Sequence, residues 1–478
     1  MAYQNPFYIT TTLPYVNADP HIGFALEIVH ADCVARYQRL MGREVFFSTG
    51  ADEHGQKIFQ KATEEGQDVQ AYVDHYASRF KKLQSALNLS NDTFIRTTDP
   101  SHIAAAQKLW ELCKEAGDIY KKKYKGLYCV GDEAFIKESD LVNGRCPNHP
   151  NMVLIEIEEE NYFFRLSAYQ DKLLAYLAQE EVIVPEWRRK EAIAFVSQGL
   201  EDFSISREKA RMSWGIPVPG DDAQVMYVWF DALTNYISTL GWPDDTGGNF
   251  KKFWEDGFTV QTAGKDQVRF QSIMWQAMLM SAKLPVTKEV VYHGFITSGG
   301  QKMSKSLGNV IDPFSLVEEY GTDAVRYFLL RHIHPFDDSD FTVERFRDAY
   351  NADLANGLGN LVARIMKLAE DNLEKGTRPE PEGFPQAYTG ALEKLEINKA
   401  ADVIWERIKL LDQQITDTAP FKVIKTNPEE GRELISALTL ELYGIAQMLG
   451  PFMPATAETI KQAIVENKKP DNLFVRKE

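Results

Sequence analysis

Two lysines three positions apart, Lys302 and Lys305, stand in a short stretch with glycines on both sides. This stretch, Gly299–Asn309 (the lysine loop), reads GGQKMSKSLGN. Glycine lets a backbone bend close to a ligand, and lysines at this spacing can bracket a polyphosphate as mobile point charges. Most lysine-bearing loops are solvated turns, but the string KMSKS is rare by chance in a chain of 478 residues. The string therefore favours a phosphate-binding role over a plain turn.

A second place for phosphate chemistry lies near the N-terminus. Phe7–Thr12 is rich in β-branched and aromatic residues and predicts a strand, apolar residues at helical spacing follow from Gly23 to Met41, and Glu44–Gly50 predicts another strand. Strand, helix and strand predict a βαβ unit of a parallel sheet, in which ligands bind at the carboxyl ends of the strands. His21 stands where the helix begins, so we expect a phosphate there. The alternative is a histidine that only caps the helix.

The rest of the pattern predicts the elements that must position these residues. Residues 56–115 are expected to be helical, strands from Tyr124 begin an inserted region, and further strands are expected at Phe258–Ala263 and Glu289–Thr297. From about residue 345, apolar residues step by three and four, which predicts a helical bundle. We therefore predict an α/β fold, with a Rossmann-like parallel-sheet catalytic domain, an inserted connective domain and a following all-α helical-bundle domain. The predicted division is 1–116 and 216–345 for the two catalytic halves, 117–215 for the insert and 346–478 for the bundle.

Composition narrows the class of protein. The formal net charge is −16, with 44% apolar and 26% charged residues, which argues against a non-specific nucleic-acid binder. Two local basic clusters could still read RNA, although solvated surface is the alternative: Lys121, Lys122, Lys123 and Lys125, and Lys409, Lys422, Lys425 and Arg432. No apolar run reaches the length of a membrane span and the N-terminus is not a signal peptide, so we expect a cytoplasmic protein without membrane partners. Four scattered cysteines do not make a disulfide framework.

The lysine loop resembles the second signature of class I aminoacyl-tRNA synthetases, and residues 21–24 resemble the first, H-I-G-H. Phe24 departs from that signature, which has histidine there, so one phosphate contact is absent or comes from elsewhere. Leu13–Asn17 and Gly50–Gly55 are similar to methionyl-tRNA synthetases, and the resemblance covers nearly the whole chain. It implies activation of methionine with ATP, with Mg²⁺ on the pyrophosphate, and transfer to the 2′-hydroxyl of the terminal adenosine of tRNA(Met).

The resemblance implies an ATP site in which catalysis comes from positioning and charge neutralisation. Its catalytic residues are expected to be His21, Lys302 and Lys305. A glycine and an aspartate after a strand are expected to hold the ribose hydroxyls. The full implied set for ATP is His21, Gly23, Glu27, Gly264, Asp266, His293, Lys302, Ser304 and Lys305.

The resemblance also implies a methionine site. The carboxylate of Asp52 is expected to pair with the substrate ammonium, and the alternative is a turn or N-cap aspartate. Aromatic walls suit a thioether, although the stretch Tyr227–Tyr236 could also be an ordinary aromatic core strand. Gln271 stands where the family has a pocket histidine, and it can hydrogen-bond but carries no charge. The implied set is Leu13, Tyr15, Asp52, Trp229, Ala232, Tyr236 and Gln271.

Three residues of the predicted bundle resemble the anticodon contacts of the same family. Asn360 and Arg364 are four apart and share a helix face, and the resemblance implies that they contact the anticodon CAU. Phe421 stands where the family has a tryptophan that stacks on the anticodon. Phenylalanine can also stack on a base but lacks the indole donor. The alternative for Asn360 and Arg364 is an ordinary surface pair.

A knuckle-like group stands in the predicted insert: Cys129, Asp132, Cys146 and His149. It resembles the knuckle that binds Zn²⁺ in many relatives, except that Asp132 stands where cysteine is usual. Zinc binding is one interpretation. The other is a knuckle that has lost its metal and is held together by its own core.

Together these patterns predict a methionine–tRNA ligase that uses L-methionine, ATP and tRNA(Met). Because the bundle is not followed by the OB-like domain that some relatives use to dimerise, we expect a short-form monomer. Phe24, Gln271 and Phe421 keep two alternatives open: a class I synthetase for another apolar amino acid, and a tRNA-binding paralogue with weak activity. A tRNA-independent ligase is disfavoured by the bundle.

Overall fold

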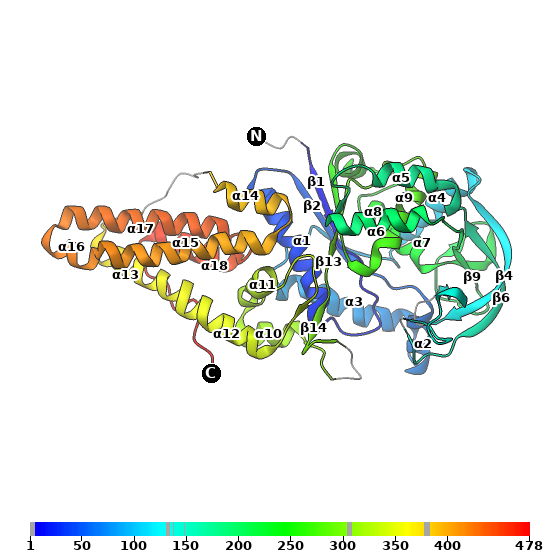
Figure 1. The fold of residues 1–478 in the computed structure, drawn as a ribbon, viewed down its shortest axis with the longest axis horizontal. Helices are drawn as coiled ribbons and strands as arrows, with labels where there is room; N and C mark the ends of the chain where they lie inside the picture. The colour runs from blue at the N-terminus through cyan, green and yellow to red at the C-terminus, as the bar shows by residue number, and fades with distance from the viewer. Residues whose placement is uncertain (1–4, 131–133, 137, 148, 304–307, 377–382) are drawn as a thin grey trace. The chain divides into compact units, whose positions relative to one another are not determined.

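The computed structural model describes residues 5–130, 134–136, 138–147, 149–303, 308–376 and 383–478. The chain forms two compact units (Figure 1). Unit 1 comprises residues up to Pro20, Arg43–Lys82 and Asn91–Tyr292, and unit 2 comprises His21–Gly42, Leu83–Ser90 and the residues from His293 onward. None of the helices in the described ranges is both long and apolar enough to cross a membrane.

A parallel six-stranded sheet organises unit 1 and confirms the predicted fold class. Its first strand begins at Phe7, and Tyr8 lies level with Phe46 on one side and with Thr259 on the other. Because the strands are parallel, their carboxyl ends meet at one edge. The strand order is β3 (Thr93–Arg96), β2 (Val45–Ala51), β1 (Phe7–Thr10), β12 (Phe258–Gly264), β13 (Glu289–His293) and β7 (Ile183–Val184).

Two predicted elements of this sheet are wrong in detail. The region 56–115 is not helical throughout, because β3 lies between the helices α2 (Gln56–Glu64), α3 (Val69–Ala86) and α4 (Pro100–Glu115). β3 is only four residues long, too short for a clear periodic signal. β3 packs closely on β2. A Cβ added at Gly50 of β2 would lie only 2.0 Å from the carbonyl oxygen of Ile95 on β3.

The expected strand Glu289–Thr297 is also wrong, since it is two strands in different sheets. β13 ends at His293, and β14 (Ile296–Ser298) belongs to a small sheet of unit 2. The break lies at Gly294, where a Cβ would be 2.2 Å from the carbonyl carbon of Asp337. A neighbouring backbone therefore occupies the space that a side chain would need.

The inserted region of unit 1 is antiparallel. β4 (Ile119–Cys129) and β6 (Ile155–Phe164) form a long ribbon, extended by β5 (Ala134–Ile136) and β8 (Phe203–Ser204). Lysines of β4 face acids of β6, as with Lys123 opposite Glu160 and Lys125 opposite Glu158. Two of the four lysines of the first basic cluster therefore stand opposite an acid across the ribbon. A second small sheet has the strand order β10 (Pro217–Val218), β11 (Asp221–Met226) and β9 (Ser206–Glu208).

The stretch Tyr227–Tyr236 is not a strand but two short helices, α7 (Val228–Leu233) and α8 (Asn235–Ser238). Apolar side chains of these helices join a core with Trp110, Trp254 and Trp275. The other helices of unit 1 are α5 (Gln170–Leu177), α6 (Glu186–Ser197), α9 (Trp275–Ser281) and the π-helices Phe250–Glu255 and Phe270–Met274.

Unit 2 carries the predicted bundle. The seam residues Leu354, Leu358, Leu361 and Ile365 are buried, while Leu368 is partly exposed. In Figure 1, α13, α15, α17 and α18 lie alongside one another. The helices are α1 (Ile22–Leu40), α10 (Pro313–Tyr320), α11 (Thr322–Arg331), α12 (Val343–Ala349), the π-helix Tyr350–Gly359, α13 (Asn360–Asn372), α14 (Gln386–Glu393), α15 (Ile397–Thr418), α16 (Pro420–Thr426), α17 (Pro428–Leu449) and α18 (Pro454–Glu466).

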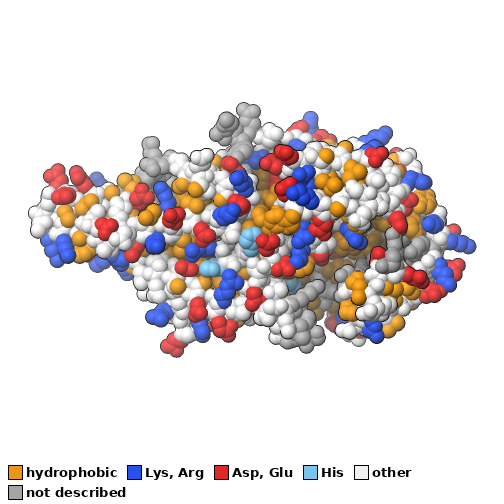
Figure 2. Space-filling view, in the orientation of Figure 1, with side chains coloured by type: hydrophobic (Ala, Val, Ile, Leu, Met, Phe, Trp, Pro, Cys, Tyr) orange, Lys and Arg blue, Asp and Glu red, His pale blue; other side chains and the backbone are white. Residues whose placement is uncertain are grey.

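A buried ion pair ties α1 to the rest of unit 2. Arg326 on α11 lies 2.7 Å from the carboxylate of Asp32 on α1, and both side chains are fully buried. The guanidinium also donates to the carbonyl oxygens of Leu87, Pro451 and Phe452. On the face drawn in Figure 2, basic and acidic side chains are interspersed over the bundle rather than gathered by sign.

Candidate functional site

His21 is the N-cap of α1. Its Nδ1 accepts a hydrogen bond from the backbone N–H of Gly23 at 3.1 Å. Because Nδ1 accepts, the ring proton must lie on Nε2, and that N–H is a donor for an anion at the helix N-terminus. The capping and phosphate-binding interpretations of His21 are therefore compatible, since they use different nitrogens.

Gly23 lies close to the ring of His21. A Cβ at this position would lie 2.9 Å from Cε1 and 3.0 Å from Nδ1 of His21, and 3.4 Å from the methyl carbon of Met303, which is an ordinary contact. Any other residue would therefore require the histidine ring to shift.

Glu27 and His293 form a pair inside unit 2. Nε2 of His293 lies 2.9 Å from a carboxylate oxygen of Glu27, and Nδ1 lies 2.7 Å from the carbonyl oxygen of Gly294. A carbonyl oxygen can only accept, so Nδ1 donates to Gly294 and the carboxyl group of Glu27 fixes the other side of the ring. Burial, with the charge of His293 as a further cause, lowers the pKa of the nearby His30 to about 3.

A tight hairpin carries the start of the lysine loop. β14 pairs with β15 (Gln301–Lys302), and the two turn residues Gly299 and Gly300 have φ of +62° and +73°. Positive φ at both positions suits a two-residue turn that only glycine adopts without strain. A carboxylate oxygen of Asp340 accepts from the N–H of Gly300 and the hydroxyl of Thr297, each at 2.7 Å. The Lys302 side chain, Ser304 and Lys305 lie outside the described residues.

The predicted ribose residues lie at the carboxyl end of β12 in unit 1. Gly264 ends the strand and is buried, and Asp266 is exposed in the short 3₁₀ turn that follows. One carboxylate oxygen of Asp266 accepts from the Gln267 side chain at 3.1 Å. Because the side chain is exposed, it is accessible to a hydroxyl ligand at the expected edge of the sheet.

Asp52 lies at the carboxyl end of β2, where it is 7% exposed. Its backbone pairs with the loop that follows β1: its N–H donates to the Pro14 oxygen at 2.9 Å, and its oxygen accepts from Val16 at 3.1 Å. Tyr15 thereby stands opposite Asp52 in a parallel bridge. The structure brings these two predicted methionine residues together, with the half-buried Leu13 just before them.

Glu53, which directly follows Asp52, is held by Arg96, Thr98 and Trp214. The carboxylate of Glu53 accepts two bonds from the guanidinium of Arg96, at 2.5 and 2.9 Å, and one from the hydroxyl of Thr98. The carbonyl oxygen of Glu53 accepts from the indole of Trp214 at 2.6 Å. A bidentate arginine and an indole therefore fix the loop that carries Asp52.

The predicted wall residues meet aromatic partners. The ring of Trp229 stacks on Phe270, with centroids 3.8 Å apart. Nε2 of Gln271 donates to the hydroxyl of Tyr236 at 2.5 Å, so the tyrosine proton is left to point elsewhere. Ala232 is buried on the same helix as Trp229. The sequence patterns missed Phe270 as the partner of Trp229, although it stands directly before Gln271.

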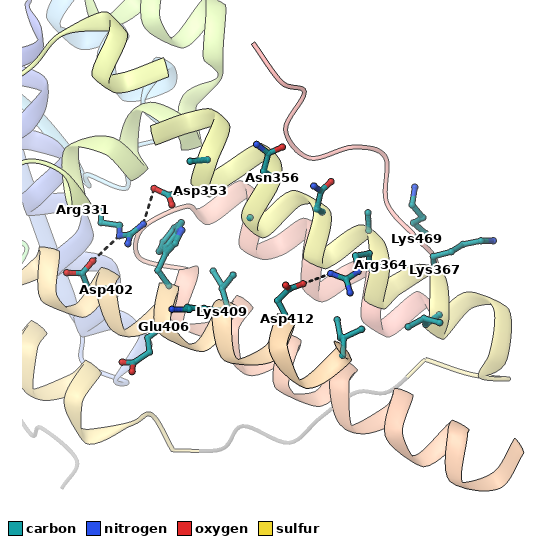
Figure 3. A pocket seen from close by; sticks show the side chains of 18 of the residues that line it. Arg331, Asp353, Asn356, Arg364, Lys367, Asp402, Glu406, Lys409, Asp412 and Lys469 are labelled. Atoms are coloured by element: carbon teal, nitrogen blue, oxygen red, sulfur yellow. Dashed lines mark hydrogen bonds and ion pairs between the residues drawn. The ribbon is translucent and has the colours of Figure 1, made fainter. Parts of the chain in front are cut away.

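A hollow of about 1160 Å³ opens along the helices of unit 2 (Figure 3). Asn360, Arg364 and Phe421 line it, so the structure brings the three predicted anticodon residues together. The π-helix Tyr350–Gly359 forms one wall with Asp353 and Asn356. π-helical turns are frequent at functional sites because they widen the backbone locally.

Two groups of ion-paired side chains line this hollow. Arg364 forms an ion pair with Asp412, and their side chains are 46% and 51% exposed. At the other end, Arg331 lies 3.0 Å from Asp402 and 3.2 Å from Asp353, and its guanidinium covers the ring of Trp405 (Figure 3). Arg331 and Trp405 were not predicted, because they stand on two helices that no local pattern connects.

Three of the four knuckle residues converge. Nδ1 of His149 lies 3.9 Å from the sulfurs of both Cys129 and Cys146, near the roughly 3.5 Å that tetrahedral zinc bond lengths require. The backbone N–H of His149 donates to the Cys146 sulfur at 3.3 Å, and both cysteines are buried. The donor set fits Zn²⁺, and the fourth predicted ligand, Asp132, lies outside the described residues.

Comparison with known proteins gives one consistent result. The family model described as "tRNA synthetases class I (M)" matches residues 7–153 and 151–366. A methionine–tRNA ligase of Rhizobium meliloti is 42% identical, over 96% of this chain and 91% of its own. One of Thermotoga maritima is also 42% identical, over 97% of this chain and 76% of its own. The Mycobacterium tuberculosis methionyl-tRNA synthetase in complex with methionyl-adenylate superposes with a TM-score of 0.90 at 36% identity, covering 99% of this chain and 100% of that one.

The parallel sheet, the histidine at a helix start and the glycine hairpin of the lysine loop are features of a class I aminoacyl-tRNA synthetase, in agreement with the matched family model. The identities, which extend over nearly the whole chain, narrow that class. The chain belongs to the methionyl-tRNA synthetase family, and its activity is that of a methionine–tRNA ligase (EC 6.1.1.10).

Proposed function

We propose that methionine binds at the carboxyl edge of the unit 1 sheet, with Asp52 as the residue that receives its ammonium group. The observation that carries this proposal is the buried Asp52 carboxylate at the end of β2, bridged to Tyr15. A buried carboxylate attracts a substrate cation strongly, because little water competes. The uncharged backbone at Leu13 and the ring of Tyr15 would line the same part of the ammonium site.

The thioether end of methionine would meet the aromatic wall. Trp229 stacked on Phe270 presents a flat apolar surface, and Ala232 leaves room for an unbranched side chain. Gln271 donates to Tyr236, so the Tyr236 hydroxyl can donate to the sulfur, a weak acceptor. This arrangement favours methionine over branched apolar amino acids.

ATP is the second substrate. Gly264 and Asp266 would hold its ribose. His21 would donate to a phosphate through Nε2, close to the backbone at Gly23, while the lysine loop residues Lys302, Ser304 and Lys305 would bind the phosphates as mobile groups. Glu27 and His293 would fix each other beside the nucleotide as a hydrogen-bonded pair. Mg²⁺ on the pyrophosphate would supply further charge neutralisation.

The reaction follows from these positions. The methionine carboxylate attacks the α-phosphorus of ATP and pyrophosphate leaves, forming methionyl-adenylate. The 2′-hydroxyl of the terminal tRNA adenosine then takes the aminoacyl group and AMP leaves. No side chain acts as a covalent nucleophile, so the rate enhancement comes from alignment and from cations near the phosphates. Since Phe24 cannot donate a hydrogen bond, Lys302 and Lys305 would carry a larger share of phosphate binding.

The hollow of unit 2 would bind the anticodon of tRNA(Met). Asn360 and Arg364 offer hydrogen-bond donors to base edges, and Phe421, 42% exposed, offers a stacking surface. Lys367, Lys409 and Lys469 line the same hollow and can contact backbone phosphates.

Zn²⁺ would bind Cys129, Cys146 and His149, with Asp132 as the fourth ligand, and would hold the knuckle together. We expect one zinc per chain in metal analysis of the purified protein, lost in Cys146→Ser. The four domain boundaries, the cytoplasmic location and the monomeric state stay predictions, which limited proteolysis, fractionation and sedimentation test.

ATP–pyrophosphate exchange with each apolar amino acid tests the proposed pocket directly. We expect exchange with methionine and little with leucine, isoleucine or valine. Exchange with another amino acid at comparable kcat/KM would favour the first alternative function. Lys305→Ala should slow exchange strongly, and an unchanged rate would favour a tRNA-binding paralogue whose lysine loop does not catalyse.

A further inference from the structure

A buried aspartate, Asp231, joins two histidines from distant parts of unit 1. One carboxylate oxygen lies 2.7 Å from Nδ1 of His54, and the other lies 2.7 Å from Nε2 of His102. The side chains of Asp231 and His102 are fully buried, and that of His54 is 7% exposed. Each oxygen therefore has its own imidazole N–H donor, which fixes the orientation of both rings.

The His54 arm of this cluster leads to the proposed ammonium site. His54 stands two residues after Asp52, on the loop that follows β2. Asp231 stands on α7, two residues after Trp229 and directly before Ala232. The bond between His54 and Asp231 therefore joins the loop that carries the carboxylate to the helix that carries the aromatic wall.

The His102 arm leads to the other wall helix. His102 lies in the first turn of α4, and its Nδ1 lies 2.9 Å from the hydroxyl of Ser238 on α8. Ser238 stands two residues after Tyr236. Through His102, Asp231 is thus connected to the helix that carries the hydroxyl proposed to face the sulfur.

Burial and the two histidines have opposite effects on the Asp231 carboxyl, and together they hold the cluster in one arrangement. Burial alone would raise the pKa of Asp231, but the charge and hydrogen bonds of His54 and His102 outweigh it and lower that pKa. The carboxylate therefore stays ionised in the interior. Removal of either imidazole would leave a buried charged oxygen without its donor, so the helix and the loop would have to move to supply another.

We propose that Asp231 is a positioning residue for methionine activation: through His54 and His102 it holds the Asp52 loop and the wall helices α7 and α8 in one fixed arrangement. It would contact neither methionine nor ATP. The inference rests on the methionine contacts proposed above, and it adds a reason why they keep their spacing when the pocket is empty.

Two pairs of variants test it, with ATP–pyrophosphate exchange as the readout. His102→Leu removes the donor, whereas His102→Gln keeps a nitrogen close to the position of Nε2. We expect KM for methionine to rise about tenfold or more in His102→Leu, with KM for ATP within about twofold, and most of the loss to be recovered in His102→Gln. His54→Leu and His54→Asn repeat the comparison at a site that is slightly exposed, in case His102→Leu does not fold.

Asp118 provides the matched control. It is buried in unit 1 and accepts from the hydroxyls of Tyr169 and Ser281, but it touches none of the proposed methionine contacts. Asp118→Asn should lower the melting temperature and leave KM for methionine unchanged. The proposal is overturned if Asp231→Asn behaves like Asp118→Asn, or if the Leu and Gln variants of His102 are alike. If Asp52→Asn also leaves KM for methionine unchanged, the proposed methionine site itself is wrong.

Discussion

The proposed methionine wall of unit 1 and the hollow of unit 2 both include a π-helix, Phe270–Met274 and Tyr350–Gly359, yet they are built differently. In unit 1 Gln271 and Tyr236 are buried, and they are hydrogen-bonded to each other. In unit 2 the ion pair of Arg364 with Asp412 is about half exposed. A small substrate brings little binding energy, so its site must be arranged beforehand. An RNA brings its own charges and can replace surface ion pairs at little cost.

The largest effect is expected at the buried site. Asp52→Asn replaces a buried carboxylate by a neutral amide of the same shape, so the methionine ammonium loses its charge partner. We expect kcat/KM for methionine in ATP–pyrophosphate exchange to fall about 10²–10³-fold, with little change in KM for ATP. Glu65, an exposed acid in unit 1, serves as the control in Glu65→Gln. A fall of less than threefold in Asp52→Asn would place the ammonium elsewhere.

The hollow of unit 2 should respond only when tRNA takes part. Phe421→Ala removes the proposed stacking surface, which is worth about 1–3 kcal/mol per base. Aminoacylation kcat/KM for tRNA(Met) should fall about tenfold to a hundredfold, while exchange without tRNA stays at the parent value. Phe421→Trp should retain or improve tRNA affinity. Equal activity of the Ala and parent proteins would remove Phe421 from the anticodon site.

A smaller effect is expected from the surface ion pair. Asp412→Asn frees Arg364 from its partner, and because both side chains are about half exposed, we expect KM for tRNA to fall by no more than about fivefold at low salt. The gain should vanish at high salt, where surface charges are screened. A loss of aminoacylation in Asp412→Asn would mean that this carboxylate itself contacts the RNA.

The smallest effect at neutral pH concerns Gln271. Gln271→His should bind methionine nearly as well as the parent at pH 8, where imidazole is neutral. Below the ordinary histidine pKa of about 6.5 the ring gains a charge beside an apolar thioether, so KM for methionine should rise as the pH falls. The parent has no titrating group at this position and should show a flatter profile. Parallel profiles would mean that residue 271 does not face the substrate.

Much of this architecture could be read from the sequence, because the motifs that carry it are local. His21 and Gly23 indicate a helix start, and the hairpin glycines indicate a turn, each within a few residues. The bundle seam follows from the spacing of apolar residues alone. β3 and the break at Gly294 could not be read this way, since a four-residue strand has almost no periodic signal and the break depends on a backbone 43 residues later in the chain, at Asp337.

The residues that were missed share a different property. His102, Phe270 and Arg331 act through partners far away in the sequence: His102 meets Asp231, Phe270 meets Trp229, and Arg331 meets Trp405. No local spacing links such pairs, and only the folded structure brings them together. The sequence could thus name the groups that we expect to contact substrates more readily than the groups that hold those side chains in place.

The comparison of the two regions is tested most directly by measuring ATP–pyrophosphate exchange and tRNA(Met) aminoacylation on Asp52→Asn and Phe421→Ala in parallel. We expect Asp52→Asn to lose both activities, whereas Phe421→Ala should keep methionine-dependent exchange and lose aminoacylation. If Phe421→Ala loses exchange to the same extent as aminoacylation, or if Asp52→Asn exchanges with methionine at the parent KM, the two regions do not have the separate roles proposed for them.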